Sequence, residues 1–153
     1  MKAVAQRVDF AKVSVDDKVV GQIGKGLLVL LGVEADDQKN DAEYIAGKLV
    51  NLRIFEDRYG KMNVSLIDIS GEMLVVSQFT LLADCNRGRR PSFVNACQPE
   101  EAVKLYEYFV ELVSISVKRL ATGKFQEMMK IDLCNNGPVT LILDSRKRRG
   151  KRH

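Results

Sequence analysis

The amino-acid sequence predicts an α+β fold in which two helices are laid across a sheet. Apolar runs of strand length, bounded by turn residues, recur about eight times along the chain. Only two segments place apolar residues at helical spacing, and each follows a pair of predicted strands. This order argues against a regular alternation of strand and helix.

The N-terminal part is predicted to consist of strands. Residues 2–8 alternate between apolar and polar side chains, and residues 13–20 have the pattern of a hairpin around a charged turn. The glycines that follow do not have the G-x-G-x-x-G spacing of a dinucleotide site, so we interpret them as turn residues. The uninterrupted apolar run over residues 27–31 then predicts a buried strand.

The two predicted helices occupy the rest of the chain together with shorter strands. The first helix has an apolar face over residues 42–52 and follows a group of aspartates, as is typical of a helix N-terminus. Strands are predicted at residues 54–55, 64–69 and 73–76. Pro99 begins the longer helix, whose apolar stripe reaches Leu120 and which ends at Gly123. Strands at residues 130–134 and 139–143 are predicted to form a last hairpin.

Composition and charge limit the possible classes of protein. The 153 residues, 46% of them hydrophobic, fit one domain over residues 1–144, followed by a basic tail over residues 145–153 that we expect to be disordered. The net charge of +4 includes six basic residues in the tail, which leaves −2 for residues 1–144. No apolar stretch is long enough to span a membrane and the N-terminus has no signal core, so we expect a cytoplasmic protein without membrane partners. The cysteines form no C-x-x-C, and we expect no metal and no cofactor.

Two uncharged stretches are the candidates for chemistry. Ser77-Gln78-Phe79-Thr80-Leu81 ends a predicted strand, and Asn135-Asn136-Gly137-Pro138-Val139-Thr140 is a polar turn between apolar runs. The only histidine is His153, and histidine-based catalysis needs an imidazole held in place, so it is unlikely to operate here. Hydroxyls, amides and backbone N–H groups could instead hold a substrate, orient a water or stabilise an oxyanion. On spacing alone, we interpret both stretches as an ordinary strand end and an ordinary turn with a trans Gly-Pro bond.

Two further groups have a structural and a functional interpretation. Phe125 and Met129 could form a flat apolar platform, although packing in the core is the commoner role of such a pair. Arg87, Arg89 and Arg90 could contact phosphates, as could the tail, but neither group is interleaved with aromatic residues.

The order and spacing of several short motifs resemble the D-aminoacyl-tRNA deacylases, also called D-tyrosyl-tRNA deacylases. The resemblance covers about residues 1 to 143, and it depends on the joint occurrence of the following motifs: Gln6-Arg7-Val8, residues 26–33, Arg53-Ile54-Phe55, Gly60-Lys61-Met62-Asn63, Ser77-Gln78-Phe79-Thr80-Leu81, Arg90-Pro91-Ser92-Phe93, Thr122-Gly123-Lys124-Phe125 and Asn136-Gly137-Pro138-Val139-Thr140.

The resemblance implies an enzyme, a fold and partners. The family hydrolyses the ester between a D-amino acid and the 3′ adenosine of tRNA, and it also removes glycine from mischarged tRNA. We therefore expect a homodimer whose mostly antiparallel strands form a barrel-like sheet with two main helices. The alternative from another class is a catalytically silent RNA-binding or scaffold protein with the same fold.

The resemblance also implies roles for individual residues. Ser77, Gln78, Phe79 and Thr80 are expected to line the ester, with Thr80 or a water assisted by the RNA 2′-hydroxyl as nucleophile. A cis Gly137-Pro138 bond is expected to reach into the partner subunit's pocket and to exclude L-amino acids, with Arg7 nearby in support. Residues matching the adenine pocket are Phe125 and Met129, although residues 126–128 replace the small residues usual between them. The remaining expected contacts, to the RNA backbone, involve Arg87, Arg89 and Arg90.

Overall fold

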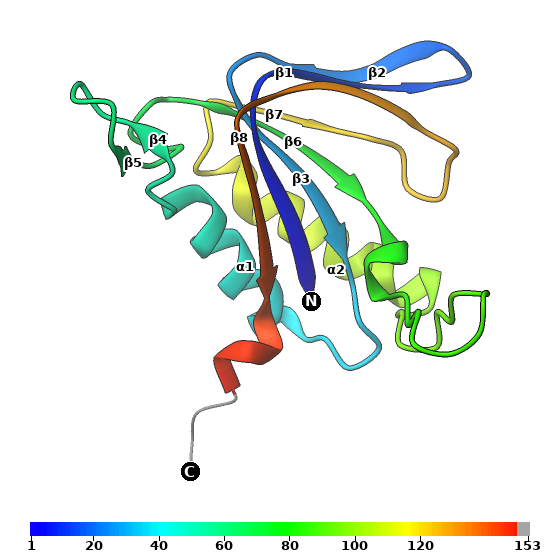
Figure 1. The fold of residues 1–153 in the computed structure, drawn as a ribbon. Coiled ribbons are helices and arrows are strands. Elements are labelled where there is room, and N and C mark those ends of the chain that lie inside the picture. Colours follow the sequence, from blue (N-terminus) through cyan, green and yellow to red (C-terminus); the bar gives the residue numbers. More distant parts are fainter. Residues whose placement is uncertain (150–153) are drawn as a thin grey trace.

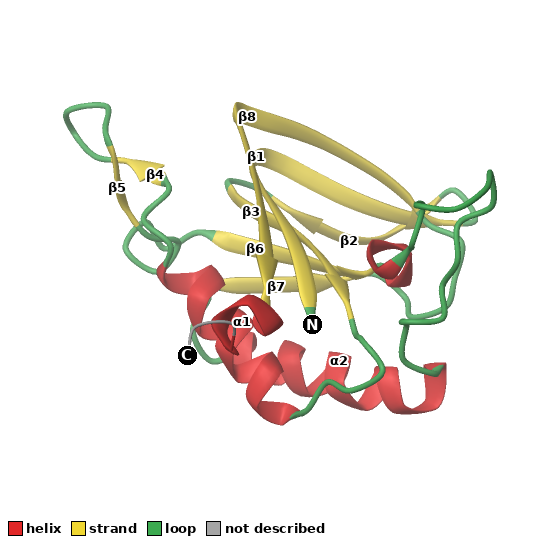
Figure 2. Ribbon diagram, turned by 60° about the horizontal axis from the view of Figure 1, so that its bottom comes forward, coloured by secondary structure: helices red, strands yellow, loops and turns green. Residues whose placement is uncertain are grey.

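A six-stranded, strongly curled sheet forms the body of the protein (Figures 1 and 2). It is seen in a computed structural model that describes residues 1–149. The strand order is β2-β1-β3-β6-β7, and β8 pairs with the other edge of β1. The strands are β1 (Lys2–Val15), β2 (Lys18–Ile23), β3 (Gly26–Gly32), β6 (Glu72–Ser77), β7 (Arg119–Thr122) and β8 (Lys130–Asp144).

The sheet curls until its two end strands meet, so the expected barrel-like sheet is confirmed. A Cβ atom added to Gly21 of β2 would lie 2.6 Å from the carbonyl oxygen of Thr122 in β7. Glycine is therefore required where the barrel nearly closes. Three of the five strand pairings in this sheet are antiparallel, and the β3–β6 and β6–β7 pairings are parallel.

The C-terminal strands do not form the predicted hairpin. Residues 130–144 are one strand, β8, and both of its halves pair with β1, from Ser14 opposite Lys130 to Lys2 opposite Asp144. The Asn-Asn-Gly-Pro sequence thus interrupts the register within one strand instead of reversing the chain. The prediction was wrong because the 14-residue strand β1 is long enough to pair with both halves.

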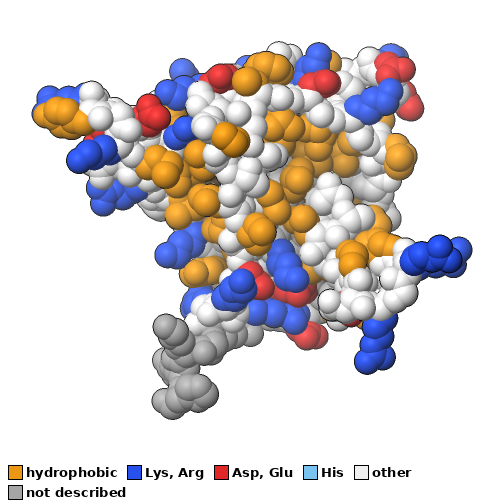
Figure 3. Space-filling view, in the orientation of Figure 1, with side chains coloured by type: hydrophobic (Ala, Val, Ile, Leu, Met, Phe, Trp, Pro, Cys, Tyr) orange, Lys and Arg blue, Asp and Glu red, His pale blue; other side chains and the backbone are white. Residues whose placement is uncertain are grey.

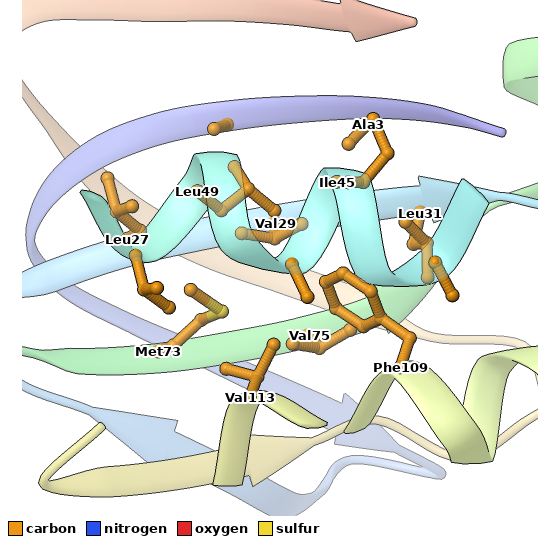
Figure 4. Close-up of a cluster of buried hydrophobic side chains, with 14 of the residues drawn as sticks. Ala3, Leu27, Val29, Leu31, Ile45, Leu49, Met73, Val75, Phe109 and Val113 are labelled. Carbon is orange, nitrogen blue, oxygen red and sulfur yellow. The ribbon is translucent and has the colours of Figure 1, made fainter. Parts of the chain in front are cut away.

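Both helices cover one face of the sheet. Helix α1 (Lys39–Asn51) begins with reciprocal hydrogen bonds between Gln38 and Asp41, which satisfy free N–H groups of the first turn. Helix α2 (Pro99–Ser114) begins with a proline followed by two glutamates, as predicted. Figure 4 shows the core between the helices and the sheet, formed by Leu27, Val29, Leu31, Ile45, Leu49, Met73, Val75, Phe109 and Val113.

Helix α2 is shorter than predicted, and a strand follows it. The helix ends at Ser114, and residues 119–122 form β7, which pairs in parallel with β6. In this pairing Leu120 lies opposite Met73, and Thr122 lies opposite Val75. The predicted strand over residues 64–69 is wrong except at Val64. That residue ends β5 (Met62–Val64), which pairs with β4 (Phe55–Glu56), and residues 66–69 lie in a turn.

A second, smaller cluster fills the inside of the barrel. It contains Val8, Ala11, Val13, Ile23, Leu28, Leu74 and Val76, and Met129, Ile131 and Leu133 pack against it. The central strands β3 and β6 are consequently buried on both faces, which explains their continuous apolar sequence.

The predicted disordered tail begins with an ordered turn. Ser145–Arg149 form the 3-10 helix η2. The Ser145 hydroxyl accepts a hydrogen bond from the Met1 ammonium at 2.9 Å, and Arg146 lies 2.9 Å from the Glu34 carboxylate. These contacts fix residues 145 and 146, whereas residues 150–153 of the predicted tail lie outside the described residues. None of the helices within residues 1–149 is long and apolar enough to span a membrane.

Tyr106 yields a prediction about stability. Its hydroxyl donates to the Val75 carbonyl oxygen at 3.1 Å, and burial raises the pKa of Tyr106 to about 12. We expect Tyr106→Phe to lower the free energy of unfolding at pH 7 by about 1 kcal/mol. An unfolded tyrosine ionises near its ordinary value of 10.0, so the contribution of Tyr106 is complete below that pH and is lost as the pH rises towards 12. Urea unfolding of both proteins should show a steeper alkaline loss in the wild type, and parallel losses would contradict this role.

Candidate active site

A cavity of about 630 Å³ opens where β6 ends. Its wall contains Ser77, Gln78, Phe79 and Thr80, and on another side Phe125 and Met129. Two sequence-distant groups of predicted site residues are therefore brought together. The lining also includes residues that the sequence reasoning did not select as site residues, among them Val33, Cys97 and Gln98. Pro99 was predicted as the start of the longer helix and lines the cavity beside them.

The end of β6 is positioned by its neighbour β3. Ser77 is the last residue of the strand, and the Gln78 backbone N–H donates to the Leu31 carbonyl oxygen at 2.8 Å. The 3-10 helix η1 (Phe79–Leu82) follows immediately. It packs closely on the end of β3, since a Cβ atom on Gly32 would lie 2.4 Å from Leu82 Cδ2. The backbone of Phe79 and Thr80 is thus held by packing on the barrel.

The hydroxyls of this stretch have no base beside them. The Gln78 side-chain amide donates a short hydrogen bond to Thr80 Oγ1. Within residues 1–149, no carboxylate, imidazole or amine is hydrogen-bonded to Ser77 or Thr80. No group of three His, Cys, Asp or Glu side chains in the same part of the chain could hold a metal ion. The described groups that are hydrogen-bonded to Ser77 and Thr80 therefore include no general base, and the one carboxylate residue in the cavity lining is Glu127.

Aromatic rings form two walls of the cavity. Phe79 is exposed and meets the edge of Phe93 at 5.1 Å between ring centroids. Phe125 packs on the buried Tyr106 at 5.6 Å, and Met129 passes close to Gly123, where a Cβ atom would lie 2.6 Å from the Met129 sulfur. The cavity thus contains flat apolar surface beside the polar strand end, as binding of a planar group requires.

The Arg7 side chain holds the interrupted part of β8, at Asn136, in place by hydrogen bonds. Its buried guanidinium donates to the carbonyl oxygens of Ile54 at 2.8 Å and Asn136 at 3.1 Å, and to the Asn136 side chain at 3.3 Å. The Gly137-Pro138 bond is cis. The trans bond predicted from general frequencies is therefore wrong, and the cis bond implied by the family resemblance agrees with the structure. Gly137 and Pro138 are exposed and do not line the cavity of their own chain.

The three predicted arginines lie on the loop beside the cavity. Arg87, Arg89 and Arg90 are exposed between Asp84 and Ser92, whose backbone groups exchange hydrogen bonds of 2.8 and 2.9 Å. Phe93 follows directly and lines the cavity. Figure 3 shows Lys and Arg side chains projecting from the side of the molecule where this loop lies.

Known proteins resemble this chain along nearly its whole length. A family model described as D-Tyr-tRNA(Tyr) deacylase matches residues 4–144. A Thermosipho melanesiensis protein named D-aminoacyl-tRNA deacylase is 57% identical over 148 residues, which cover 96% of this chain and 99% of that protein. A protein of the same name from Desulfatibacillum aliphaticivorans is 59% identical over 146 residues, which cover 95% and 100%.

Two solved structures are also similar. One, described as c-Myc DNA Unwinding Element Binding Protein, has a TM-score of 0.89 and 39% identity, and the match covers 94% of this chain and 98% of that chain. The other, described as a probable eukaryotic D-amino acid tRNA deacylase, has a TM-score of 0.83 with 18% identity and coverages of 93% and 97%. At this identity, the second shows a shared fold.

The buried contacts of Arg7 predict a stability effect. Arg7→Met keeps much of the side-chain volume but leaves the Ile54 and Asn136 carbonyl oxygens without their donors. We expect the free energy of unfolding to fall by about 2 kcal/mol or more. Arg53→Met is the matched control, because exposed Arg53 donates to one backbone carbonyl, that of Asn63, at 2.8 Å. Equal losses in urea unfolding of the two variants would contradict the role of Arg7.

Proposed function

The chain belongs to the D-Tyr-tRNA(Tyr) deacylase family and is a hydrolase of the D-aminoacyl-tRNA deacylase kind, and we propose that its cavity binds the aminoacylated 3′ end of tRNA. The reaction is hydrolysis of the ester between the D-amino acid and the 3′ adenosine, and glycine mischarged on tRNA is a second substrate. The main support is the single cavity that combines residues 77–80 with Phe125 and Met129.

In this proposal the terminal adenine lies against Phe125 and Met129, and the ester lies at residues 77–80. The N–H groups of Phe79 and Thr80 are the first two of η1, so the short helix provides them with no acceptor of its own. Directed at the ester carbonyl, such N–H groups would stabilise the oxyanion of the tetrahedral intermediate. Gln78 and Ser77 contribute polar contacts around it.

We favour water as the nucleophile, assisted by the 2′-hydroxyl of the substrate. Thr80 already accepts a hydrogen bond from Gln78 and has no base to remove its proton. Water adds to the ester carbonyl carbon, the bond to the 3′ oxygen breaks, and that oxygen takes up a proton. The products are the free D-amino acid and tRNA.

Selection against L-amino acids is assigned to Gly137 and Pro138 of a partner subunit. Their carbonyl oxygens would contact the α-amino group of the substrate and leave no space for an L side chain. The exposure of the two residues and their support by Arg7 favour this role, because the backbone is both accessible and held in place. It requires a homodimer, which we include in the proposal.

The remaining parts of the proposal concern RNA and location. Arg87, Arg89 and Arg90 lie beside the cavity, where they would contact the phosphates next to the 3′ end. The basic tail adds nonspecific tRNA affinity, and the enzyme acts in the cytoplasm. The alternative of a catalytically silent RNA-binding protein disagrees with the relatives named D-aminoacyl-tRNA deacylase, and the similarity to a structure described as c-Myc DNA Unwinding Element Binding Protein agrees with nucleic-acid affinity.

The central test is deacylation of D- and L-tyrosyl-tRNA. We expect the wild type to hydrolyse the D substrate and to leave the L substrate intact. Thr80→Val should reduce kcat by less than about tenfold if backbone N–H groups and water perform the chemistry, whereas loss of a covalent nucleophile costs several orders of magnitude. Hydrolysis of both enantiomers or of neither by the wild type would refute the function, and an inactive, folded Thr80→Val would refute the water mechanism.

A glycine substitution tests the selection step. Gly137 has φ +123°, and an added Cβ would lie 2.8 Å from Arg7 Nη2, so Gly137→Ala must displace the Gly-Pro backbone. We expect at least about tenfold loss of D-tyrosyl-tRNA deacylation or of preference over the L substrate. Gly60→Ala is the control for the preference between the D and L substrates, since Gly60 also has positive φ, at +73°, but lies in an open turn of the β4–β5 hairpin and does not line the cavity. Unchanged rate and preference in a folded Gly137→Ala protein would remove this role.

A further inference from the structure

A basic and aromatic surface lies away from the cavity, on the outside of α1 and on the β4–β5 hairpin. In Figures 1 and 2 the hairpin projects from the body at the end opposite the loop of residues 83–98, and in Figure 3 Lys and Arg side chains gather over it. We call this the α1–hairpin surface and define it by its basic residues and tyrosines: Lys48, Arg53, Arg58, Lys61, Arg148, Tyr44 and Tyr59.

The tip of the hairpin is held in one conformation. The Asp57 carboxylate accepts hydrogen bonds from the backbone N–H groups of Tyr59 at 2.8 Å and Lys61 at 3.1 Å, and from the Asn63 side chain at 3.3 Å. The two backbone bonds are the main reason why the pKa of Asp57 is lowered. This turn presents a tyrosine ring that is 71% exposed, so the ring is preorganised for contact with another molecule.

Cations lie against the aromatic rings of this surface. The Arg58 guanidinium is 4.8 Å from the centroid of the Tyr59 ring. Arg148 and Lys48 lie 5.2 and 5.9 Å from the centroid of Tyr44. Of the four cation–π contacts within residues 1–149, three are therefore on the α1–hairpin surface. This interleaving, absent from the arginine loop, is typical of surfaces that bind RNA.

The positive charge of the surface is available to an incoming anion. Among the described residues, no carboxylate lies within 4.0 Å of any of its five basic side chains. Two nearby carboxylates are already occupied, Asp57 by the turn and Glu43 by the Tyr108 hydroxyl at 2.7 Å. A phosphate could approach without first breaking an ion pair.

A shallow groove of about 610 Å³ begins at Glu43 and Tyr44 and ends at Arg53, two residues before the β4–β5 hairpin. Its lining runs along the outside of α1 to the base of the hairpin and consists of Glu43, Tyr44, Gly47, Lys48, Asn51, Leu52 and Arg53. Gly47 leaves the groove open, because it has no side chain and no atom lies within 4 Å of the position that a Cβ atom would occupy. An extended, negatively charged chain would fit along this groove, whose two basic residues, Lys48 and Arg53, outnumber the one acidic residue, Glu43.

We propose that the α1–hairpin surface is a second RNA-contact site, which binds the tRNA substrate outside its 3′ end. The five basic side chains contact phosphates, and Tyr59 stacks on an unpaired base. This inference rests on the proposed function, because that function supplies a tRNA as the partner. The surface would increase the affinity for whole tRNA and take no part in the hydrolysis of the ester.

The test is binding of uncharged tRNA to the full chain at several salt concentrations. The triple variant Lys48→Gln, Arg58→Gln, Lys61→Gln should bind about tenfold more weakly, and the slope of log affinity against log salt should fall by roughly 2 to 3. Tyr59→Ala should weaken binding about tenfold with little change in slope, and Tyr59→Phe should bind as the wild type does. The control Lys18→Gln, Lys25→Gln, Lys118→Gln makes the same change in charge at exposed positions elsewhere and should have a smaller effect.

Hydrolysis of D-tyrosyl-adenosine, which lacks the RNA body, separates this inference from the function. The triple variant should cleave this small ester at the wild-type rate while losing tRNA affinity. Wild-type affinity and slope in the triple variant, or an equal loss in the control, would overturn the second site. Failure of the wild-type protein to cleave any D-aminoacyl ester would instead refute the proposed function, and tRNA binding would still report on the surface.

Discussion

One backbone carbonyl, that of Val75, connects the parts of the site. Its oxygen accepts the Tyr106 hydroxyl from α2 and the Gly123 N–H from the segment after β7, both at 3.1 Å. Tyr106 in turn supports Phe125, and Val75 lies two residues before Ser77. A single buried acceptor thus fixes the strand end, the second helix and the aromatic wall relative to one another. Because the oxygen is buried, loss of either donor is costly.

The burial of β3 and β6 on both faces decides where polar groups can lie. Leu28 and Leu74 point into the barrel, whereas Val29 and Val75 face the helices, so the middle of each strand is apolar. In β6 the polar residues are the first, Glu72, and the last, Ser77, where the strand leaves the core. In the proposed function, the chemistry at the Ser77 end uses backbone N–H groups, hydroxyls and amides, which agrees with a chain whose one histidine is the last residue.

The sequence predicted most elements because local patterns and tertiary structure agree there. The group of aspartates before residue 42 and Pro99 indicated the two helix N-termini, and α1 and α2 begin there, at Lys39 and at Pro99. The prediction of a hairpin at Gly137 was wrong because the same turn residues also occur where a single strand is interrupted. Only the length of the partner strand β1 distinguishes an interrupted strand from a hairpin. Leu120 continued a helical stripe, yet parallel pairing with β6 gave its backbone better partners. Competition between local and long-range pairing cannot be resolved from one segment alone.

The candidate site was likewise predicted only in part from the sequence. Composition limited its chemistry and the resemblance named its residues, but spacing alone favoured an ordinary strand end at residues 77–81 and an ordinary turn at residues 135–140. The α1–hairpin surface was missed because its members are far apart in sequence: Lys48 lies on a helix, Tyr59 at a turn and Arg148 in the predicted tail. In the proposed function the cavity itself has little attraction for a polyanion, because Glu127 is the one charged residue in its lining, so charges outside the cavity would supply the energy of RNA binding. Separating the phosphate contacts from the ester would leave the cavity to select the amino acid by backbone shape.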